Sequence, residues 1–411
     1  MKTLLCDLTR NEVELLGLNE RYDAVVDADD AAASRPCSGC FGCWMRTPSV
    51  CTVRDRLGDL SALLGATDEL HIASRCTYGG WSAPVKRILD RSLGYLNPRF
   101  TVRNGKLGHR PRFTNHLVSK VWFYGPSTES ERSCARTLAQ ADSENRSSAL
   151  KGVWFPADPA GIGIEKDDPA IPDHAPYADA PTALPKRIAL INASPRGKHA
   201  TTELILNDFE DAFNVYACHG ASRDSIIPTL SRFIWDQADA FDPHDPTDVD
   251  TIVLGYPLYC DSLPSHVIEL LDEWSDRRAL APTTRLYAIA NMGLYEPSQI
   301  LPSFRMLEHA CIHMNLVWCG GVAAGAGGMI PALAGTPRMG IMRRNLSEAI
   351  DKLILAVRCG TDAGTIEARA AIPRFAYALA AESQWKAQAR RNGTTNLNSR
   401  VPYQGQYAPN R

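Results

Sequence analysis

Four cysteines in the first half of the chain could hold a metal cluster. They are Cys37, Cys40, Cys43 and Cys51. Their spacing, C-x2-C-x2-C-x7-C, places three thiolates on one tight loop and a fourth shortly after it, which suits a 4Fe–4S cluster. Zinc more often binds two separated C-x2-C pairs. A loop of reduced thiols without a metal is equally open, because Phe41 and Trp44 between the cysteines could form a buried wall.

A loop in the second half has the residue types of a phosphate site. This loop, NASPRGKHATT (192–202), follows an expected strand and precedes an expected helix. Free backbone N–H groups and the positive end of the helix would therefore meet where an anion can bind. We expect the ligands to come from Ser194, Arg196, Gly197, Lys198, Thr201 and Thr202. Because no G-x-G-x-x-G is present, we expect a monophosphate rather than a dinucleotide; the alternative is an ordinary capped turn.

Two more loops of the second half follow expected strands. In PLYCDSLP (257–264) the ring of Tyr259 could cover a flat cofactor, and in NMGLYE (291–296) backbone groups near Gly293 could bond the polar edge of a flavin. The candidate residues in these loops are Pro257, Leu258, Tyr259, Asp261, Asn291, Met292 and Gly293. Loops after the first, third and fourth strands of a doubly wound sheet surround one crevice. The alternative for Tyr259 is a core aromatic residue.

The two halves share a pattern that positions these groups. ELHIASRCTYGGWSAPVKRILD (69–90) and DTIVLGYPLYCDSLPSHVIELLD (250–272) each join a buried strand, a loop with one tyrosine and a helix that begins at a proline. In the first half, Tyr78 and Trp81 flank two glycines that permit close approach to a planar ring. The first half has no counterpart of the phosphate loop, so we expect Tyr78 and Trp81 to help enclose a flavin held by the second half.

The alternation of short apolar strands with helices predicts an α/β protein with two flavodoxin-like doubly wound parallel sheets in tandem. The expected strands of the second half are 187–193, 251–255, 285–291 and 315–320. The expected domains are 1–155 with the cysteines and a degenerate phosphate loop, a proline-rich linker 156–186, 187–360 with the phosphate loop, and a C-terminal helix and extended tail 361–411. We expect the tail after Gly393 to lie as an arm on a partner subunit.

Composition excludes several classes of protein. A length of 411 residues suits two domains, and 45% apolar with 22% charged residues is typical of globular proteins. A formal charge of −2 argues against a nucleic-acid or membrane-surface partner. No apolar run is long enough to span a bilayer, and the first residues turn polar too early for a signal peptide. We therefore expect a cytoplasmic protein.

With these motifs in view, the chain resembles the flavodoxin-fold NADPH-dependent FMN reductase family and its iron–sulfur flavoprotein branch. The matching segments are CSGCFGCW (37–44), Cys51, TYGGWSAPVKRILDR (77–91), NASPRG (192–197), PLYCDSLP, NMGLYEPSQ (291–299) and WCGGVAAGAGGM (318–329). The resemblance implies FMN, dimeric packing that completes the flavin site, and reduction by NAD(P)H or by a cluster. Two copies in one chain depart from the family pattern, as do Met292 and Leu294, which replace residues that are usually cysteine and aromatic.

The expected function is an FMN-dependent oxidoreductase that uses NAD(P)H to reduce a small acceptor. The phosphate-loop hydroxyl and basic residues would anchor the 5′-phosphate, Tyr259 and Asp261 would border the ring, and Asn291 with Gly293 would hold its pyrimidine edge. Tyr259, Tyr295 and His266 are candidate proton donors. The alternatives are an iron–sulfur electron carrier that serves a redox protein without an organic substrate, and a flavin-binding pseudoenzyme. We expect an internal pseudo-dimer, with a homodimer as the alternative.

Overall fold

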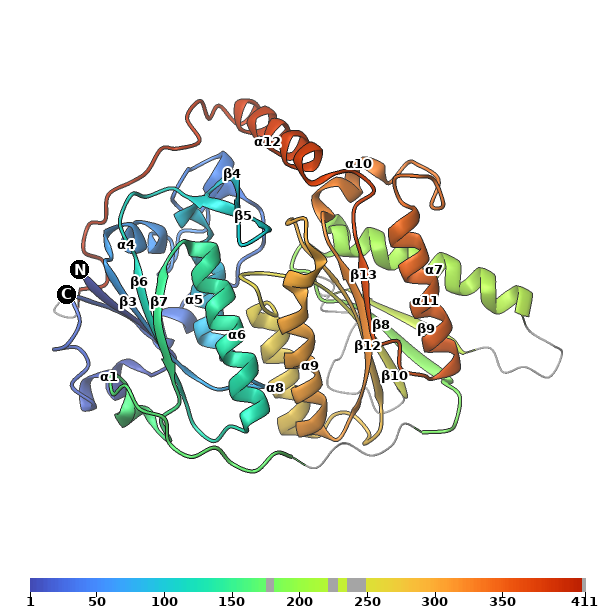
Figure 1. Ribbon diagram of the computed structural model, residues 1–411, viewed down its shortest axis with the longest axis horizontal. Helices are drawn as coiled ribbons and strands as arrows, with labels where there is room; N and C mark the ends of the chain where they lie inside the picture. The colour runs from blue at the N-terminus through green and yellow to red at the C-terminus, as the bar shows by residue number, and fades with distance from the viewer. Residues whose placement is uncertain (175–180, 221–227, 235–248, 409–411) are drawn as a thin grey trace. The chain divides into compact units, whose positions relative to one another are not determined.

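The computed structural model describes residues 1–174, 181–220, 228–234 and 249–408 (Figure 1). Backbone contacts divide the chain into two units. The first unit comprises Met1–Asp173, Pro264–His266 and Ala378–Arg411, and the second comprises His174–Leu263 and Val267–Tyr377. Each unit contains one parallel sheet flanked by helices, so the expected fold class is confirmed.

The first unit is built on a five-stranded parallel sheet of order β2-β1-β3-β6-β7. Its strands are β1 (Lys2–Cys6), β2 (Ala24–Val26), β3 (Glu69–Arg75), β6 (Val118–Tyr124) and β7 (Ala149–Trp154). Its helices are α1 (Arg10–Leu15), α2 (Ala28–Ala32), α3 (Gly42–Met45), α4 (Leu60–Ala66), α5 (Ala83–Arg91) and α6 (Glu129–Arg146). A hairpin of β4 (Leu96–Arg103) and β5 (Lys106–Pro111), which the sequence pattern did not predict, is inserted between α5 and β6.

The second unit has a six-stranded parallel sheet of order β9-β8-β10-β11-β12-β13. Its strands are β8 (Arg187–Asn192), β9 (Thr229–Ile234), β10 (Thr251–Pro257), β11 (Arg285–Asn291), β12 (Val317–Ala324) and β13 (Thr365–Ala368). Its helices are α7 (Thr201–Gly220), α8 (Ser265–Arg277), α9 (Leu301–Met314), α10 (Ile330–Leu333) and α11 (Arg344–Cys359). Helix α12 (Arg374–Arg391) begins in the second unit and from Ala378 onward belongs to the first. Helices α7 and α11 pack together on one face of the sheet, and α8 and α9 lie on the other (Figure 1).

Both sheets place their first five strands in the spatial order 2-1-3-4-5, which is the flavodoxin-like order. In this topology the strand order reverses beside the first strand, and a crevice opens at the carboxyl ends of the strands. The carboxyl ends of β8, β10 and β11 carry the three loops predicted to bind a cofactor. No helix in the described ranges is both long enough and apolar enough to cross a bilayer.

The domain boundaries differ from those expected. Ile162, within the predicted linker, is 1% exposed in the core of the first unit, and Ile164 accepts a 2.8 Å hydrogen bond from the Trp122 indole. The start of the linker is thus packed because it has apolar side chains to bury; residues 175–180 lie outside the described residues. Strand β13 lies beyond the expected end at 360 and completes the second sheet, since it pairs with β12.

The two units use the same turn after their third strand. Thr77 bridges Gly80 in the first unit, and Tyr259 bridges Ser262 in the second. The two central residues of each turn have positive φ: 52° and 75° at Tyr78 and Gly79, and 40° and 59° at Cys260 and Asp261. This is the type I′ pattern. Tyr78 therefore corresponds to Cys260, so the single tyrosines of the two loops are not equivalent.

A buried histidine makes the first unit sensitive to acid. His71 on β3 lies 2.8 Å from the Tyr22 hydroxyl and 2.7 Å from Glu69 Oε1. Neutral imidazole satisfies both bonds, and burial lowers the pKa of His71 to about 4. The unfolded chain, with an ordinary histidine pKa near 6.5, therefore binds a proton first as pH falls.

We expect the contribution of His71 to folding stability to be constant above pH 6.5 and to fall as the pH drops toward 4. Between pH 7 and pH 5 the loss is on the order of 2 kcal/mol. Urea unfolding at the two pH values should show a smaller loss in His71→Gln than in the wild type. Equal losses would contradict this assignment.

Candidate functional site

The phosphate loop of the second unit is shaped by Asn192 at the end of β8. The Asn192 side chain accepts a 2.9 Å bond from the Ser194 N–H and donates a 3.1 Å bond to the Gly197 carbonyl. Gly197 has φ of 48°, a conformation that glycine adopts at little cost. The loop therefore folds around its own first residue. Asn192 was not among the predicted site residues, although an asparagine after a strand often forms a turn.

The start of α7 offers free backbone donors. Thr201 and Thr202 are its first residues, so their N–H groups have no acceptor within the helix. No other acceptor for them occurs in the described part of the chain. The positive end of a 20-residue helix adds to the attraction for an anion. Around this point Arg196 is half-buried and Lys198 is exposed, so positive charge is available at the rim.

One acidic residue lies in the first turn of α7, where its negative charge would oppose the binding of an anion unless a positive group neutralised it. Glu203 is 9% exposed, and its carboxylate accepts bonds of 2.7 Å from Asn192 Nδ2 and 2.6 Å from Arg232 Nη2. Arg232 lies on β9, the strand beside β8. The negative charge of Glu203 is thus neutralised by Arg232, which lies on a strand that the sequence pattern did not predict. An anion can then bind at the free N–H groups without an uncompensated carboxylate beside it.

Asn291 joins the three loops to one another. Its amide nitrogen donates to Thr202 Oγ1 at 2.7 Å and to the Tyr256 carbonyl at 3.3 Å. The backbone carbonyl of Asn291 accepts a 2.8 Å hydrogen bond from the Leu258 N–H. The loops after β8, β10 and β11 therefore meet at one residue, as the strand order predicted. The Asn291 amide nitrogen is used by the protein, so its direct contact with a cofactor stays a prediction.

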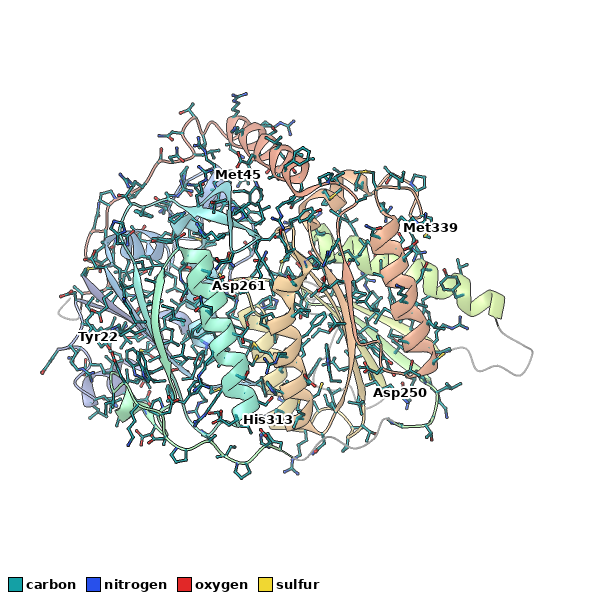
Figure 2. The ribbon with its side chains drawn as sticks, in the orientation of Figure 1. Tyr22, Met45, Asp250, Asp261, His313 and Met339 are labelled. Carbon is teal, nitrogen blue, oxygen red and sulfur yellow. The ribbon has the colours of Figure 1, made fainter. Side chains whose placement is uncertain are left out.

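The remaining predicted residues surround this junction. Asp261, labelled in Figure 2, is 5% exposed at the turn after β10, and Pro257, Leu258 and Tyr259 are half-buried. Gly293 is exposed, with nothing within 4 Å of where a Cβ would lie, whereas Met292 is 4% exposed.

Two tyrosines hold the loop after β11. The Tyr377 hydroxyl donates to the Gly293 carbonyl, and the Tyr295 hydroxyl donates to the Ile372 carbonyl at 2.8 Å. Tyr377 was not predicted as a site residue, because it lies far along the chain on α12. The hydroxyl proton of Tyr295 is committed to a carbonyl, and His266 is 3% exposed within α8.

The first unit closes the equivalent anion position with its own carboxylates. Helix α1 begins at a capping box in which the Thr9 N–H donates to Glu12 Oε2 at 2.7 Å. The next N–H, of Arg10, donates to Asp29 Oδ2 at 2.9 Å. The negative charges of the Glu12 and Asp29 carboxylates would repel a phosphate at this position. Of the first-unit flavin candidates, Tyr78 is 6% exposed, and Trp81 is fully buried with its ring 4.6 Å from that of Phe123.

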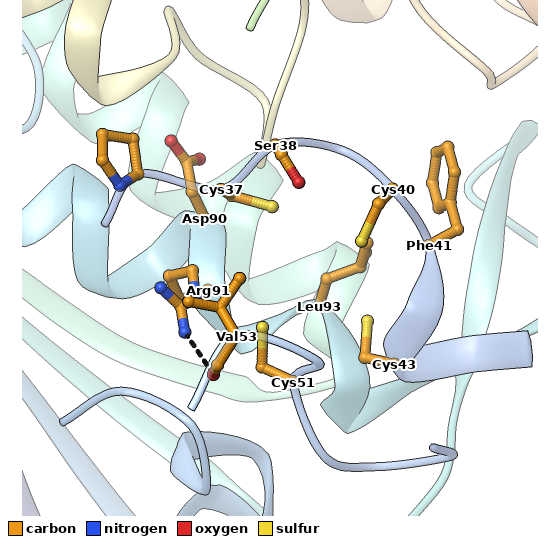
Figure 3. A pocket seen from close by; sticks show the side chains of 11 residues that line it. Cys37, Ser38, Cys40, Phe41, Cys43, Cys51, Val53, Asp90, Arg91 and Leu93 are labelled. Atoms are coloured by element: carbon orange, nitrogen blue, oxygen red, sulfur yellow. Dashed lines mark hydrogen bonds between the residues drawn. The ribbon is translucent and has the colours of Figure 1, made fainter. Parts of the chain in front are cut away.

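The four predicted cysteines of the first unit point into one pocket. Figure 3 shows the sulfur atoms of Cys37, Cys40, Cys43 and Cys51 directed toward a shared space. The pocket is also lined by Phe41, Val53, Asp90, Arg91 and Leu93. No three metal-ligand atoms of this run lie within 4.8 Å of one another in the described residues. Thiolates around one zinc ion lie about 3.8 Å apart, whereas those of a cubane bind separate irons and are spread further.

Burial and hydrogen bonds shift the pKa values of Cys37, Cys40 and Cys43 in different directions. Burial raises the pKa of Cys37, and it raises that of Cys43 to about 12. Burial acts in the same direction on Cys40, but hydrogen bonds from the Gly42 N–H and the Thr52 hydroxyl outweigh it and lower its pKa. The Gly42 nitrogen lies 3.4 Å from Cys40 Sγ. Four thiols that line one pocket are a donor set that an iron–sulfur cluster can use.

Comparisons with known proteins show no family for this chain. No family model and no curated protein matches the chain. Among solved structures, the azoreductase from Bacillus anthracis str. Sterne is 10% identical, with a TM-score of 0.28, over 42% of this chain and 99% of that one. The NAD(P)H:quinone oxidoreductase from Methanothermobacter marburgensis is 11% identical, with a TM-score of 0.25, over 43% and 96%. A flavoprotein in complex with FMN from Lactobacillus acidophilus NCFM is 12% identical, with a TM-score of 0.20, over 36% and 97%. Because all three TM-scores lie below 0.5, no conclusion about this chain is drawn from these likenesses.

Proposed function

We propose that the chain is an FMN-dependent oxidoreductase that takes electrons from NAD(P)H and passes them to a small acceptor. One observation carries the proposal: Asn291 brings the loops after β8, β10 and β11 together beside the free N–H groups of Thr201 and Thr202. This position lies at the carboxyl ends of the strands, where flavodoxin-like sheets bind ligands. When bound, FMN would supply a group that accepts a hydride and releases electrons singly or in pairs.

The residues of the second unit would share the work of holding the cofactor. The 5′-phosphate would be bound by Ser194, Arg196, Gly197, Lys198, Thr201 and Thr202. The ring would be bordered by Pro257, Leu258, Tyr259 and Asp261, and its polar edge by Asn291, Met292 and Gly293. Tyr377 would act as a positioning residue, because its hydroxyl holds the Gly293 carbonyl. Tyr78 and Trp81 of the first unit are proposed to help enclose the ring.

A second candidate function concerns the first unit. The four thiols of Cys37, Cys40, Cys43 and Cys51 line one pocket, and among the described residues no three of their sulfur atoms lie within 4.8 Å of one another, as ligands of a single zinc ion would. We therefore propose that they bind a 4Fe–4S cluster that relays single electrons. In that case the chain would serve a redox protein as an electron carrier, with or without an organic substrate.

Purification without air, followed by cofactor release and iron analysis, tests both proposals. The oxidoreductase is supported if NADH or NADPH bleaches the bound flavin and the cofactor that is then released is FMN. Iron and sulfide with FMN that NAD(P)H does not bleach support the electron carrier. Bound FMN that neither NAD(P)H nor the cluster reduces would indicate a flavin-binding pseudoenzyme. A colourless protein that does not take up FMN would refute the proposed function.

A further inference from the structure

Arg91 brings a buried positive charge to the pocket of the four thiols. It is the last residue of α5, and its side chain is 1% exposed. Among the described residues that line the pocket, Arg91 is the single cation (Figure 3). The acid in the lining, Asp90, is hydrogen-bonded to Lys86 within the same helix. The positive charge beside the thiols therefore comes from Arg91.

The guanidinium of Arg91 joins the two ends of the segment that carries the four cysteines. Its Nη1 donates to the Arg35 carbonyl at 2.6 Å, just before the first cysteine. Its Nη2 donates to the Val53 carbonyl at 3.3 Å, just after the fourth cysteine, as the dashed line in Figure 3 shows. Both nitrogens also donate to the Asp55 carboxylate, at 2.8 and 2.7 Å. Arg91 therefore fixes both ends of the cysteine segment relative to α5.

The part of the pocket wall formed by Phe41 adds no charge. The Phe41 ring lies 5.0 Å from that of Trp385 on α12. Further along the C-terminal segment, the Thr394 hydroxyl donates to the Met45 carbonyl at 2.7 Å. The expected C-terminal arm thus packs on the first unit of its own chain, and its contact with a partner subunit stays a prediction.

One hydrogen-bond donor of Arg91 is unused. A guanidinium has five N–H donors, and the bonds to Arg35, Val53 and Asp55 use those of Nη1 and Nη2. The Nε–H is buried and has no acceptor in the described part of the chain. Buried donors without a partner are uncommon and costly, so this group calls for an explanation.

The surroundings of this donor distinguish it from others of its kind. Arg338 and Arg343 of the second unit also have a buried Nε without an acceptor, but neither lines the pocket of the four thiols. The sulfur atoms of an iron–sulfur cluster and of its thiolate ligands accept hydrogen bonds, and these bonds help to set the reduction potential. A bound cluster would therefore supply the acceptor that the Arg91 Nε–H lacks.

We propose that Arg91 fixes the cysteine segment and that its Nε–H donates a hydrogen bond to a sulfur atom of the bound cluster. The inference rests on the proposed 4Fe–4S cluster. Reduction adds a negative charge to the cluster, so a buried cation that also donates to sulfur stabilises the reduced form more than the oxidised one. Arg91 therefore raises the midpoint potential of the cluster, and the Asp55 carboxylate beside it offsets part of this effect.

Redox titration of the full chain after anaerobic reconstitution tests this role. In Arg91→Gln, which removes the charge and the Nε–H, we expect reduction of the cluster to become about 10-fold less favourable. For one electron this change is a fall of about 59 mV in the midpoint potential. Arg91→Lys, which keeps the charge, should recover part of the difference.

Asp55→Asn distinguishes the charge of Arg91 from its structural role. This variant weakens the hold on the cysteine segment, but it keeps Arg91 and removes the negative charge that offsets it. We therefore expect the midpoint potential to rise, opposite to the change in Arg91→Gln. If the two residues only held the segment in place, both variants would shift the potential in the same direction.

Arg132→Gln is the matched control for the loss of a buried arginine. Arg132 is 4% exposed, and from α6 it donates to the carbonyls of Asp168 and Pro169 without lining the pocket of the thiols. Its iron content and midpoint potential should equal those of the wild type. An equal fall of the potential in Arg132→Gln and Arg91→Gln would refute the inference.

The remaining outcomes separate this inference from the cluster itself. Wild-type protein that binds no iron overturns both. Bound iron with an unchanged midpoint potential in Arg91→Gln overturns the role of Arg91 alone, and so does a lowered potential in Asp55→Asn. If Arg91→Gln does not hold iron, Arg91→Lys and Asp55→Asn decide: a lower potential in the first with a higher one in the second supports the inference, and any other pair of shifts overturns it.

Discussion

A Thr201→Asp variant is expected to fold and to lose FMN. The new carboxylate would lie in the first turn of α7, where negative charge stabilises a helix, so the melting temperature should be unchanged or slightly raised. The same carboxylate would take the free N–H groups and repel the phosphate. Loss of charge-assisted hydrogen bonds worth about 1.5–3 kcal/mol, together with repulsion, should weaken FMN binding about 100-fold or more. Titration of cofactor-free protein with FMN measures this change.

Two controls make the result specific. Thr201→Ser keeps the hydroxyl and the helix start, so it should bind FMN as the wild type does. Glu12→Gln alters the capping carboxylate at the equivalent helix start of the first unit, and it should leave FMN affinity unchanged. Normal FMN affinity in Thr201→Asp would place the phosphate elsewhere. Raised FMN affinity in Glu12→Gln would place it in the first unit, because the variant removes a carboxylate charge that repels the phosphate there.

A Cys43→Ser variant is expected to lose its iron while it keeps FMN. Serine has nearly the same volume, but it provides no thiolate for an iron of the cluster. Anaerobic reconstitution should then leave iron and acid-labile sulfide at a small fraction of the wild-type content. The broad visible absorption of the cluster should disappear, and the flavin bands should remain.

Cys359→Ser is the matched control. Cys359 is an exposed cysteine at the end of α11 in the second unit, and it lies outside the pocket of the four thiols. It should keep both iron and FMN. Unchanged iron in Cys43→Ser would refute ligation by this residue. Equal iron loss in both variants would indicate unspecific binding to thiols.

Local pattern was sufficient for the fold and for much of the candidate site. The alternation of apolar strands and helices predicted two parallel sheets, because buried parallel strands are continuous apolar runs. The phosphate loop and the cysteine run were visible because their residues are neighbours in the chain. Strand β9 was missed because none of its residues is fully buried and charged Arg232 interrupts the apolar pattern. The β4–β5 hairpin was missed because five basic residues in 96–112 made the segment look like a solvated loop.

The sequence by itself determined which residue types could do chemistry and the order of elements that carry them. Only the tertiary structure decided how those residues are supported. Arg232 neutralises Glu203 from a neighbouring strand, Tyr377 holds Gly293 from α12, and Arg112, directly after β5, donates to the Ser399 carbonyl near the C-terminus. Each of these contacts connects segments far apart in the chain. Such contacts follow from packing and from the need to satisfy buried polar groups, and short-range sequence patterns do not encode them.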